Sequence, residues 1–197
     1  MQSICEKDRQ RLRSLARKQL EYAHSPRNAV IWKQWEALAA GRREAPTVRL
    51  LFSNFPDEVI EPRLECEGED ARRLEASLLH TLVGRELFDD DTPIVPTYDI
   101  AYKSWVDPFG LQPKITRSPN GKGFHIDPVV EDLETDLELL RGGRFGVDLE
   151  DTRRRMEFAS EMFGDILPVR LVQPSLTGAI THPLVHLMGM ESFYLSM

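Results

Sequence analysis

Two short apolar runs constrain the fold of this chain most strongly. Ile94–Ala101 (IVPTYDIA) and Ile166–Val172 (ILPVRLV) are rich in β-forming residues and are bounded by turn residues, so each predicts a buried strand. Ahead of the second run, residues 149–163 carry apolar side chains at helical spacing. A strand, an excursion, a helix and a second strand in this order predict parallel βα units. We therefore expect a fold of the α/β class.

The first 90 residues read as a helical extension with short strands. Helical spacing recurs over residues 12–23, 26–40 and 69–87. Ser25 and Pro26 predict an N-cap followed by proline at the first helical position, and Gly41 predicts the end of that helix. We expect Trp32 and Trp35 to pack in the core. The runs Thr47–Phe52 and Leu64–Cys66 predict two short strands.

Residues 91–197 form the second predicted part, which contains the first βα units. Leu111–Arg117 and Gly123–Ile126 flank a Ser-Pro-Asn-Gly turn and predict a hairpin. Asp132–Leu140 predicts a short acidic helix, and Pro183 predicts the start of a last helix.

Composition and charge exclude several classes of protein. The 197 residues are 41% hydrophobic, which is enough to build a core. The formal charge of −7 and a pI near 5.3 argue against a nucleic-acid partner. Cys5 and Cys66 are the only cysteines, so no disulfide framework is expected. Without an apolar run of about 20 residues or a signal peptide, we expect a soluble, cytoplasmic protein with no membrane partner.

The C-terminal string FYLSM is apolar and uncapped. Two barrel strands cannot close a barrel, which needs eight strands and about 250 residues. We therefore expect the chain to be a truncated N-terminal portion of a longer protein.

Several strings resemble those of a known family, the uroporphyrinogen decarboxylase superfamily. Its first barrel strand ends in a Phe-Ser-Asp-Ile pattern, and residues 97–100 read Thr-Tyr-Asp-Ile here. A PSLTG string follows the second predicted strand, where those enzymes have a Gly-Ala-Pro-Trp-Thr-like string. The strings WKQWEALAAGRREAPTV and GDILPV are similar to a divergent branch of corrinoid-linked methyltransferases. The resemblance implies the N-terminal portion of a TIM (β/α)8 barrel, preceded by the helical extension.

The resemblance makes Asp99 the candidate catalytic residue. The family's aspartate at this strand end faces the cavity and accepts hydrogen bonds from pyrrole N–H groups of the substrate. Barrel active sites form at the C-terminal ends of the strands, where a carboxylate can hold a cationic or N–H-rich intermediate or act in acid–base catalysis. An N-cap or a loop salt bridge is the alternative role for Asp99.

One departure from the family bears on the substrate. The decarboxylases carry an Arg-Gln-Ala-Gly-Arg string that holds the acidic side chains of the porphyrinogen, and AAGRRE at residues 39–44 is only a superficial echo. Without those arginines, a substrate with eight carboxylates loses its main bidentate partners. The family's methyltransferases bind zinc through a His and two Cys in the later half of the barrel. The resemblance therefore implies no cofactor within this portion. For the full-length protein, it leaves open whether a corrinoid partner and a zinc ion bind.

Four further residues are weaker candidates for substrate binding. Strict alternation from Asp99 brings Thr97 near the cavity and sends Tyr98 to the helix layer. His125 lies in the predicted hairpin and could line the mouth of the cavity. Gln173 and Thr177 follow the second strand, where they could bind a ligand or cap the next helix.

We expect no metal site among these residues. His182 and His186 are spaced for one helix face, but the string HPLVH lacks the glutamate of HExxH. Pro183 also predicts that the helix begins between the two histidines.

The leading hypothesis is a uroporphyrinogen decarboxylase-like enzyme that acts in corrinoid-linked methyl transfer. Its expected ligand is a tetrapyrrole, a corrinoid or another small molecule, and a corrinoid protein is a candidate partner. The first alternative is a tetrapyrrole decarboxylase in the strict sense. The second is an inactive barrel fragment or interaction module, and we expect the portion alone to be inactive.

Overall fold

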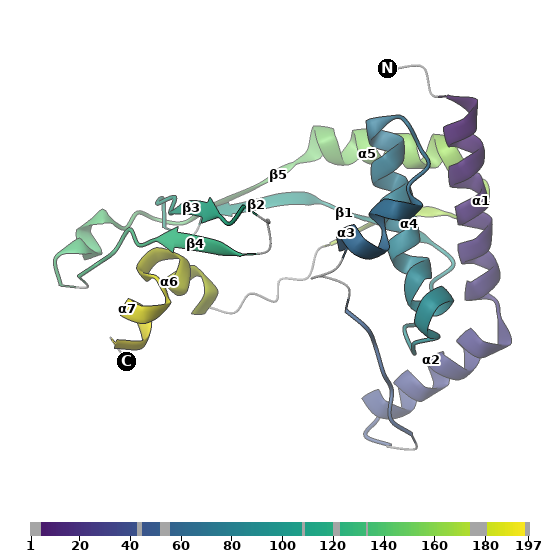
Figure 1. Cartoon of the computed structure of the whole chain (residues 1–197), viewed down its shortest axis with the longest axis horizontal. Helices are drawn as coiled ribbons and strands as arrows, with labels where there is room; N and C mark the ends of the chain where they lie inside the picture. The colour runs from purple at the N-terminus through teal and green to yellow at the C-terminus, as the bar shows by residue number, and fades with distance from the viewer. Residues whose placement is uncertain are drawn as a thin grey trace. The chain divides into compact units, whose positions relative to one another are not determined.

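The computed structural model describes residues 5–42, 45–51, 56–107, 109–119, 123–132, 134–173 and 181–195 (Figure 1). The chain is of the mixed α/β class, as predicted. The described helices are α1 (Glu6–Ala23), α2 (Pro26–Ala39), α3 (Pro56–Val59), η1 (Glu61–Arg63), α4 (Glu69–Phe88), η2 (Asp136–Leu139), α5 (Leu149–Phe163), α6 (Thr181–Met188) and α7 (Met190–Leu195). The strands are β1 (Tyr98–Ala101), β2 (Lys103–Asp107), β3 (Lys114–Arg117), β4 (Phe124–Asp127), β5 (Arg144–Asp148) and β6 (Val169–Val172).

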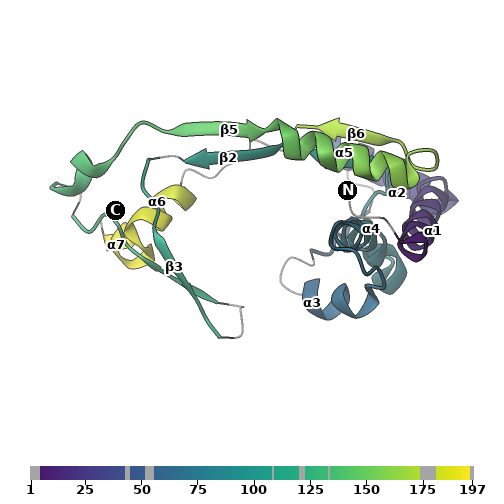
Figure 2. The same ribbon diagram turned by 90° about the horizontal axis from the view of Figure 1, so that it is seen from above.

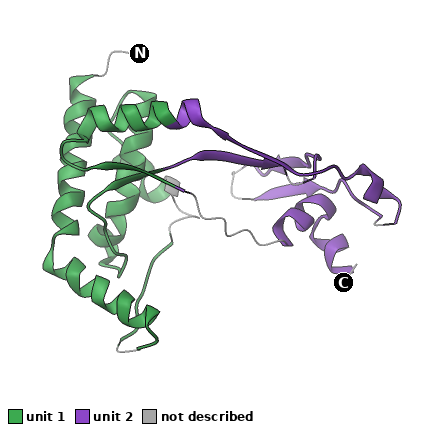
Figure 3. Cartoon of the chain, turned by 180° about the vertical axis from the view of Figure 1, so that it is seen from behind, with its two compact units in different colours: residues 1–100, 153–172 green, residues 101–152, 173–197 purple. Residues whose placement is uncertain are grey.

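The chain divides into two compact units (Figure 3). Unit 1 comprises Met1–Ile100 and Arg153–Val172, and unit 2 comprises Ala101–Thr152 and Gln173–Met197. In the described residues the strands form two-stranded sheets with the orders β1–β6, β2–β5 and β3–β4. The sequence-based division at residue 90 stays a prediction.

Unit 1 is built around two long helices. Helices α1 and α4 lie side by side (Figure 2) and bury leucines at the predicted helical spacing. Helix α5 adds Ala159, Met162 and Phe163, all fully buried, to the same apolar cluster. The periodicity therefore placed these three helices correctly.

The corner between α1 and α2 follows the predicted capping pattern. The Asn28 N–H donates to the Ser25 hydroxyl at 3.2 Å, and Pro26 is the first residue of α2. Gly41 follows the helix with φ +74°, a left-handed conformation that favours glycine. The core prediction for Trp32 is wrong, because its side chain is exposed. Trp35 is half-buried and its indole N–H donates to the Asp91 carbonyl at 2.5 Å.

Neither of the two strands predicted before residue 90 is present in the described residues. In residues 45–51 the N–H groups of Val48 and Leu50 donate to the carboxylates of Asp91 and Asp90. Around Cys66, the carboxylate of Glu75 accepts the backbone N–H groups in the same way. Side-chain carboxylates supply the partners that a neighbouring strand would otherwise provide.

Strands β1 and β6 form the sheet that carries Asp99. The Tyr98 N–H at the start of β1 donates to the Pro168 carbonyl just before β6, at 2.9 Å. From this bond both strands extend toward their C-terminal ends, so they run parallel, as the sequence predicts. Both are shorter than the predicted runs, and residues 94–97 lead into β1 without joining a strand.

Unit 2 contains two antiparallel ribbons and a small core. In the β2–β5 ribbon Trp105 lies opposite Gly146, and in the β3–β4 ribbon Thr116 lies opposite His125. The predicted hairpin is thereby confirmed. The buried apolar residues of this unit's cluster are Val130, Leu187 and Met188.

Two predictions in unit 2 are wrong. The predicted helix over Asp132–Leu140 is only the single turn η2, because the carboxylates of Asp132 and Asp136 accept nearby backbone N–H groups. Helix α6 begins at Thr181 rather than at Pro183, so the proline lies in its first turn, where a missing N–H costs no helical bond.

No described helix has both the length and the apolar character needed to cross a membrane.

Candidate functional site

Asp99 lies on the face of the β1–β6 sheet opposite the core of unit 1. Its neighbours Tyr98 and Ile100 are 9% and 5% exposed and pack in the apolar cluster with α4 and α5. Tyr98 meets the ring of Phe163 edge-on, with ring centroids 5.2 Å apart. Alternation along β1 therefore turns the Asp99 side chain away from the helices, where 32% of it is exposed.

Arg170 on β6 binds Asp99 across the sheet. The Nε–H donates to Oδ1 at 2.9 Å, and Nη2–H donates to Oδ2 at 2.8 Å. Thr97 adds its hydroxyl, which donates to Oδ1 at 2.9 Å. We call these three residues the Asp99 face.

The charge state of Asp99 follows from these contacts. The hydrogen bonds from Arg170 hold the pKa of the carboxyl below its usual value, with a smaller effect of the same sign from Thr97. The same contact raises the pKa of Arg170. Asp99 is therefore a carboxylate at neutral pH, suited to accepting hydrogen bonds and unsuited to donating a proton.

The Asp99 face keeps capacity for a ligand. Asp99 uses two of the five N–H groups of Arg170, which leaves the outer edge of a guanidinium that is 54% exposed. On the carboxylate, Oδ1 accepts from two donors and Oδ2 from one, so the described residues leave one acceptor position of Oδ2 unused. The face can bind an N–H donor and an anionic group side by side.

Helix α1 holds the backbone that precedes Asp99. The buried Gln19 side chain donates through Nε2 to the carbonyls of Val95 and Thr97 at 3.1 and 3.0 Å. This fixes residues 95–97, and with them the Thr97 hydroxyl that meets Asp99.

Two of the other predicted site residues, His125 and Gln173, belong to unit 2. His125 is an exposed residue of β4 in unit 2, with Nε2 3.3 Å from the carboxylate of Asp127. Gln173 is exposed directly after β6. Thr177 lies outside the described residues.

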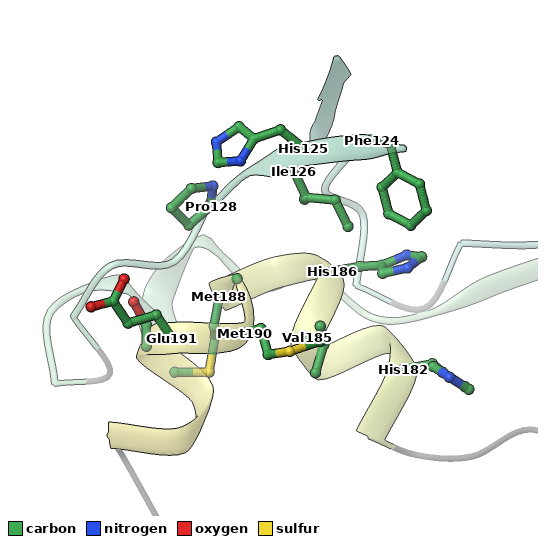
Figure 4. Close-up of a pocket in the computed structure, with 12 residues that line it drawn as sticks. Phe124, His125, Ile126, Pro128, His182, Val185, His186, Met188, Met190 and Glu191 are labelled. Atoms are coloured by element: carbon green, nitrogen blue, oxygen red, sulfur yellow. The ribbon is translucent and has the colours of Figure 1, made fainter. Parts of the chain in front are cut away.

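Unit 2 contains a cavity of about 570 Å³ between β4 and α6 (Figure 4). Apolar side chains such as Phe124, Ile126 and Val185 line it, together with His125, His182 and His186. Because α6 begins at Thr181, His182 and His186 are both helical, and the prediction that the helix begins between them is wrong. Among the described residues, no three His, Cys, Asp or Glu side chains are grouped closely enough to hold a metal ion.

Arg170 is the residue of this site that sequence reasoning missed. It is the one charged residue in the apolar run ILPVRLV, and a charge in a buried-strand pattern was the available signal. Arg170 and Asp99 are 71 positions apart in the sequence, and their pairing depends on the register between β1 and β6.

Comparison with protein families, with curated proteins and with solved structures gave no significant match.

Proposed function

We propose that this chain supplies the first βα units of a (β/α)8 barrel of the uroporphyrinogen decarboxylase-like superfamily, which acts in corrinoid-linked methyl transfer. The observation that carries the proposal is the position of Asp99, an ionised carboxylate on the face of a parallel strand pair that points away from the helices. In such barrels the helices form the outer layer, and functional residues lie at the strand ends. The resemblance of residues 97–100 to the family's strand-end motif supports the same assignment.

In this proposal Asp99 positions the ligand by accepting a hydrogen bond from an N–H group at its free Oδ2 position. Arg170 keeps Asp99 ionised and directs the outer edge of its guanidinium toward an anionic group of the ligand. Thr97 and Gln19 fix the carboxylate and the backbone before it, so that little reorganisation is needed on binding.

A bound corrinoid would supply the transfer of a methyl group from a donor to an acceptor. The peripheral amides of a corrinoid offer N–H donors, and an exposed carboxylate with a free acceptor position fits them. For zinc, Cys5 is exposed and Cys66 is buried beside Glu75, so they form no pair of ligands, and zinc stays a proposal for other parts of the protein.

A tetrapyrrole decarboxylase is the second candidate, and one observation favours it. Beside Asp99, the outer edge of the Arg170 guanidinium can bind a carboxylate of the substrate through two hydrogen bonds. In the decarboxylases the arginine string, which is missing here, has this function.

Two reactions with the full-length protein, of which this chain supplies the first βα units in the proposal, separate the candidates. The first follows demethylation of methylcobalamin in the presence of a thiol, and the second follows carbon dioxide release from uroporphyrinogen. We expect demethylation, with a rate that falls about tenfold or more in the Asp99→Asn variant. Efficient carbon dioxide release would overturn the preference for methyl transfer. Absence of both reactions would overturn both enzyme proposals and favour the interaction module.

The matched control is Asp165→Asn. Asp165 also accepts a bidentate bond from an arginine, Arg13, at 2.7 Å for both contacts, but it lies outside the β1–β6 sheet. In the full-length protein this variant should keep the activity of the unmodified enzyme.

A further inference from the structure

The geometry points to a second site, a divalent transition-metal site formed by His182 and His186 on α6. It uses none of the residues of the Asp99 face, so it stands or falls independently of the proposed function. The site would take a metal such as Cu²⁺, Ni²⁺ or Zn²⁺, with water or a small ligand completing its coordination.

The course of α6 places the two histidines on one face of the helix. Because the helix runs from Thr181 to Met188, His182 and His186 are both helical and one turn apart. A spacing of four residues turns the second side chain by roughly 40° from the first, so the two lie on one face of the helix. Figure 4 shows both rings extending from α6 on the same side.

The surroundings leave both rings accessible to a metal. His182 and His186 are exposed, and both line the cavity between β4 and α6. No hydrogen bond or ion pair between either ring and another described residue competes with coordination. The third histidine of the cavity, His125, extends from β4 away from α6 in Figure 4, so it is not a ligand of this site.

The ligand chemistry selects the class of metal. Neutral imidazole suits Cu²⁺, Ni²⁺ and Zn²⁺, whereas Mg²⁺ and Ca²⁺ prefer oxygen ligands. Two protein ligands leave coordination positions open toward the cavity, in contrast to a closed structural site with four. Among the three metals, Cu²⁺ should bind most tightly by the general order of stability.

The test is calorimetric titration of the purified chain, made without a histidine tag and freed of metal with a chelator. We expect one equivalent of Cu²⁺ and of Zn²⁺ to bind and Mg²⁺ not to bind. His182→Ala and His186→Ala should each weaken binding by about tenfold or more. Both positions are exposed, so these variants should keep the helical circular dichroism of the unmodified chain.

Three further variants separate the site from adventitious binding to histidine. His80→Ala changes an exposed histidine on α4 and should leave binding unchanged. His125→Ala should also leave it unchanged, because that ring is not a ligand. The double variant Thr181→His/His182→Ala keeps two histidines on α6 but places them roughly 140° apart, so binding should be lost.

Three results would overturn the inference. One is binding of Cu²⁺ and Zn²⁺ no tighter than that of Mg²⁺. The second is unchanged binding in either single variant of the pair or in the respaced double variant. The third is loss of binding in His125→Ala.

Discussion

Arg170 and Asp99 are joined by two parallel N–H···O bonds of 2.9 and 2.8 Å across the β1–β6 sheet. This geometry fixes the plane of both groups, because a guanidinium and a carboxylate match in a bidentate pair. It explains how a carboxylate on an exposed strand face keeps one orientation. It also predicts how Asp99 titrates.

Replacing Arg170 with glutamine should raise the pKa of Asp99 toward its ordinary value, because the hydrogen bonds from Arg170 are the main cause of the lowered pKa. The measurement is a pH titration of the Asp99 side-chain carboxyl carbon by NMR. Arg13→Gln is the control and should leave the Asp99 titration unchanged, since Arg13 pairs with Asp165.

The sign of the accompanying stability change follows from the lowered pKa. The Asp99 contribution is present above the ordinary aspartate pKa of about 3.9 and is lost as the pH falls below it. An Asp99 pKa that is the same with and without Arg170 would contradict the description of the Asp99 face.

Replacing Glu75 with glutamine should lower the free energy of unfolding by about 2 to 4 kcal/mol, because it breaks a buried ion pair. Glu75 is fully buried and accepts from Arg11 Nε at 2.7 Å and from the Cys66 N–H at 2.8 Å. Urea unfolding measures the change. Glu69→Gln, at a side chain that is 79% exposed, should stay within about 0.5 kcal/mol of the unmodified chain.

The Glu75 effect should also depend on pH. Burial on its own would raise the pKa of Glu75, but the bonds from the Cys66 N–H and from Arg11 bring it below its usual value. Its stabilisation is therefore present above the ordinary glutamate pKa of about 4.3 and lost as the pH falls below it. The gap between the unmodified chain and Glu75→Gln should narrow in acid, and a gap that widens would contradict this account.

The two cysteines should differ sharply toward thiol reagents. Burial, with the nearby Glu75 carboxylate, raises the pKa of the Cys66 thiol to about 12, whereas Cys5 is exposed. Dithionitrobenzoate should label one thiol rapidly in the folded chain and both in denaturant. A Cys5→Ser variant that still labels rapidly when folded would show that Cys66 is accessible.

The rates of amide hydrogen exchange should differ between the two compact units. Among the described residues, the apolar cluster of unit 1 includes fully buried residues of α1, α4 and α5, whereas that of unit 2 has three buried residues. Amides of α1 and α4 should therefore exchange slowly, and those of β3 and β4 rapidly. Equal protection in both units would contradict the division of the core.

The helices of this chain were predictable because their signals are local. Helical spacing and the Ser25–Pro26 cap depend on neighbouring residues, and the structure confirms α1, α2, α4 and α5. The two strands predicted before residue 90 are absent from the described residues, and the reason is non-local. Distant carboxylates, those of Asp90, Asp91 and Glu75, accept the N–H groups of these segments, and a pattern of β-forming residues does not reveal such partners.

The candidate site was predictable in part. Alternation correctly placed Thr97 and Asp99 on one face and Tyr98 on the other. The partner of Asp99 was not predicted, because the register of β1 against β6 decides which side chain of β6 it meets. The helical start of α6 was missed because proline is tolerated in a first turn as well as just before a helix.

The central claim, that the Asp99 face binds an N–H-rich ligand, is tested most directly by equilibrium binding of methylcobalamin to the chain and to its Asp99→Asn and Asp165→Asn variants. Quenching of tryptophan fluorescence reports the bound fraction. We predict that Asp99→Asn weakens binding by about tenfold or more and that Asp165→Asn leaves it unchanged. Equal affinity in all three proteins, or no binding to the unmodified chain, would contradict the claim.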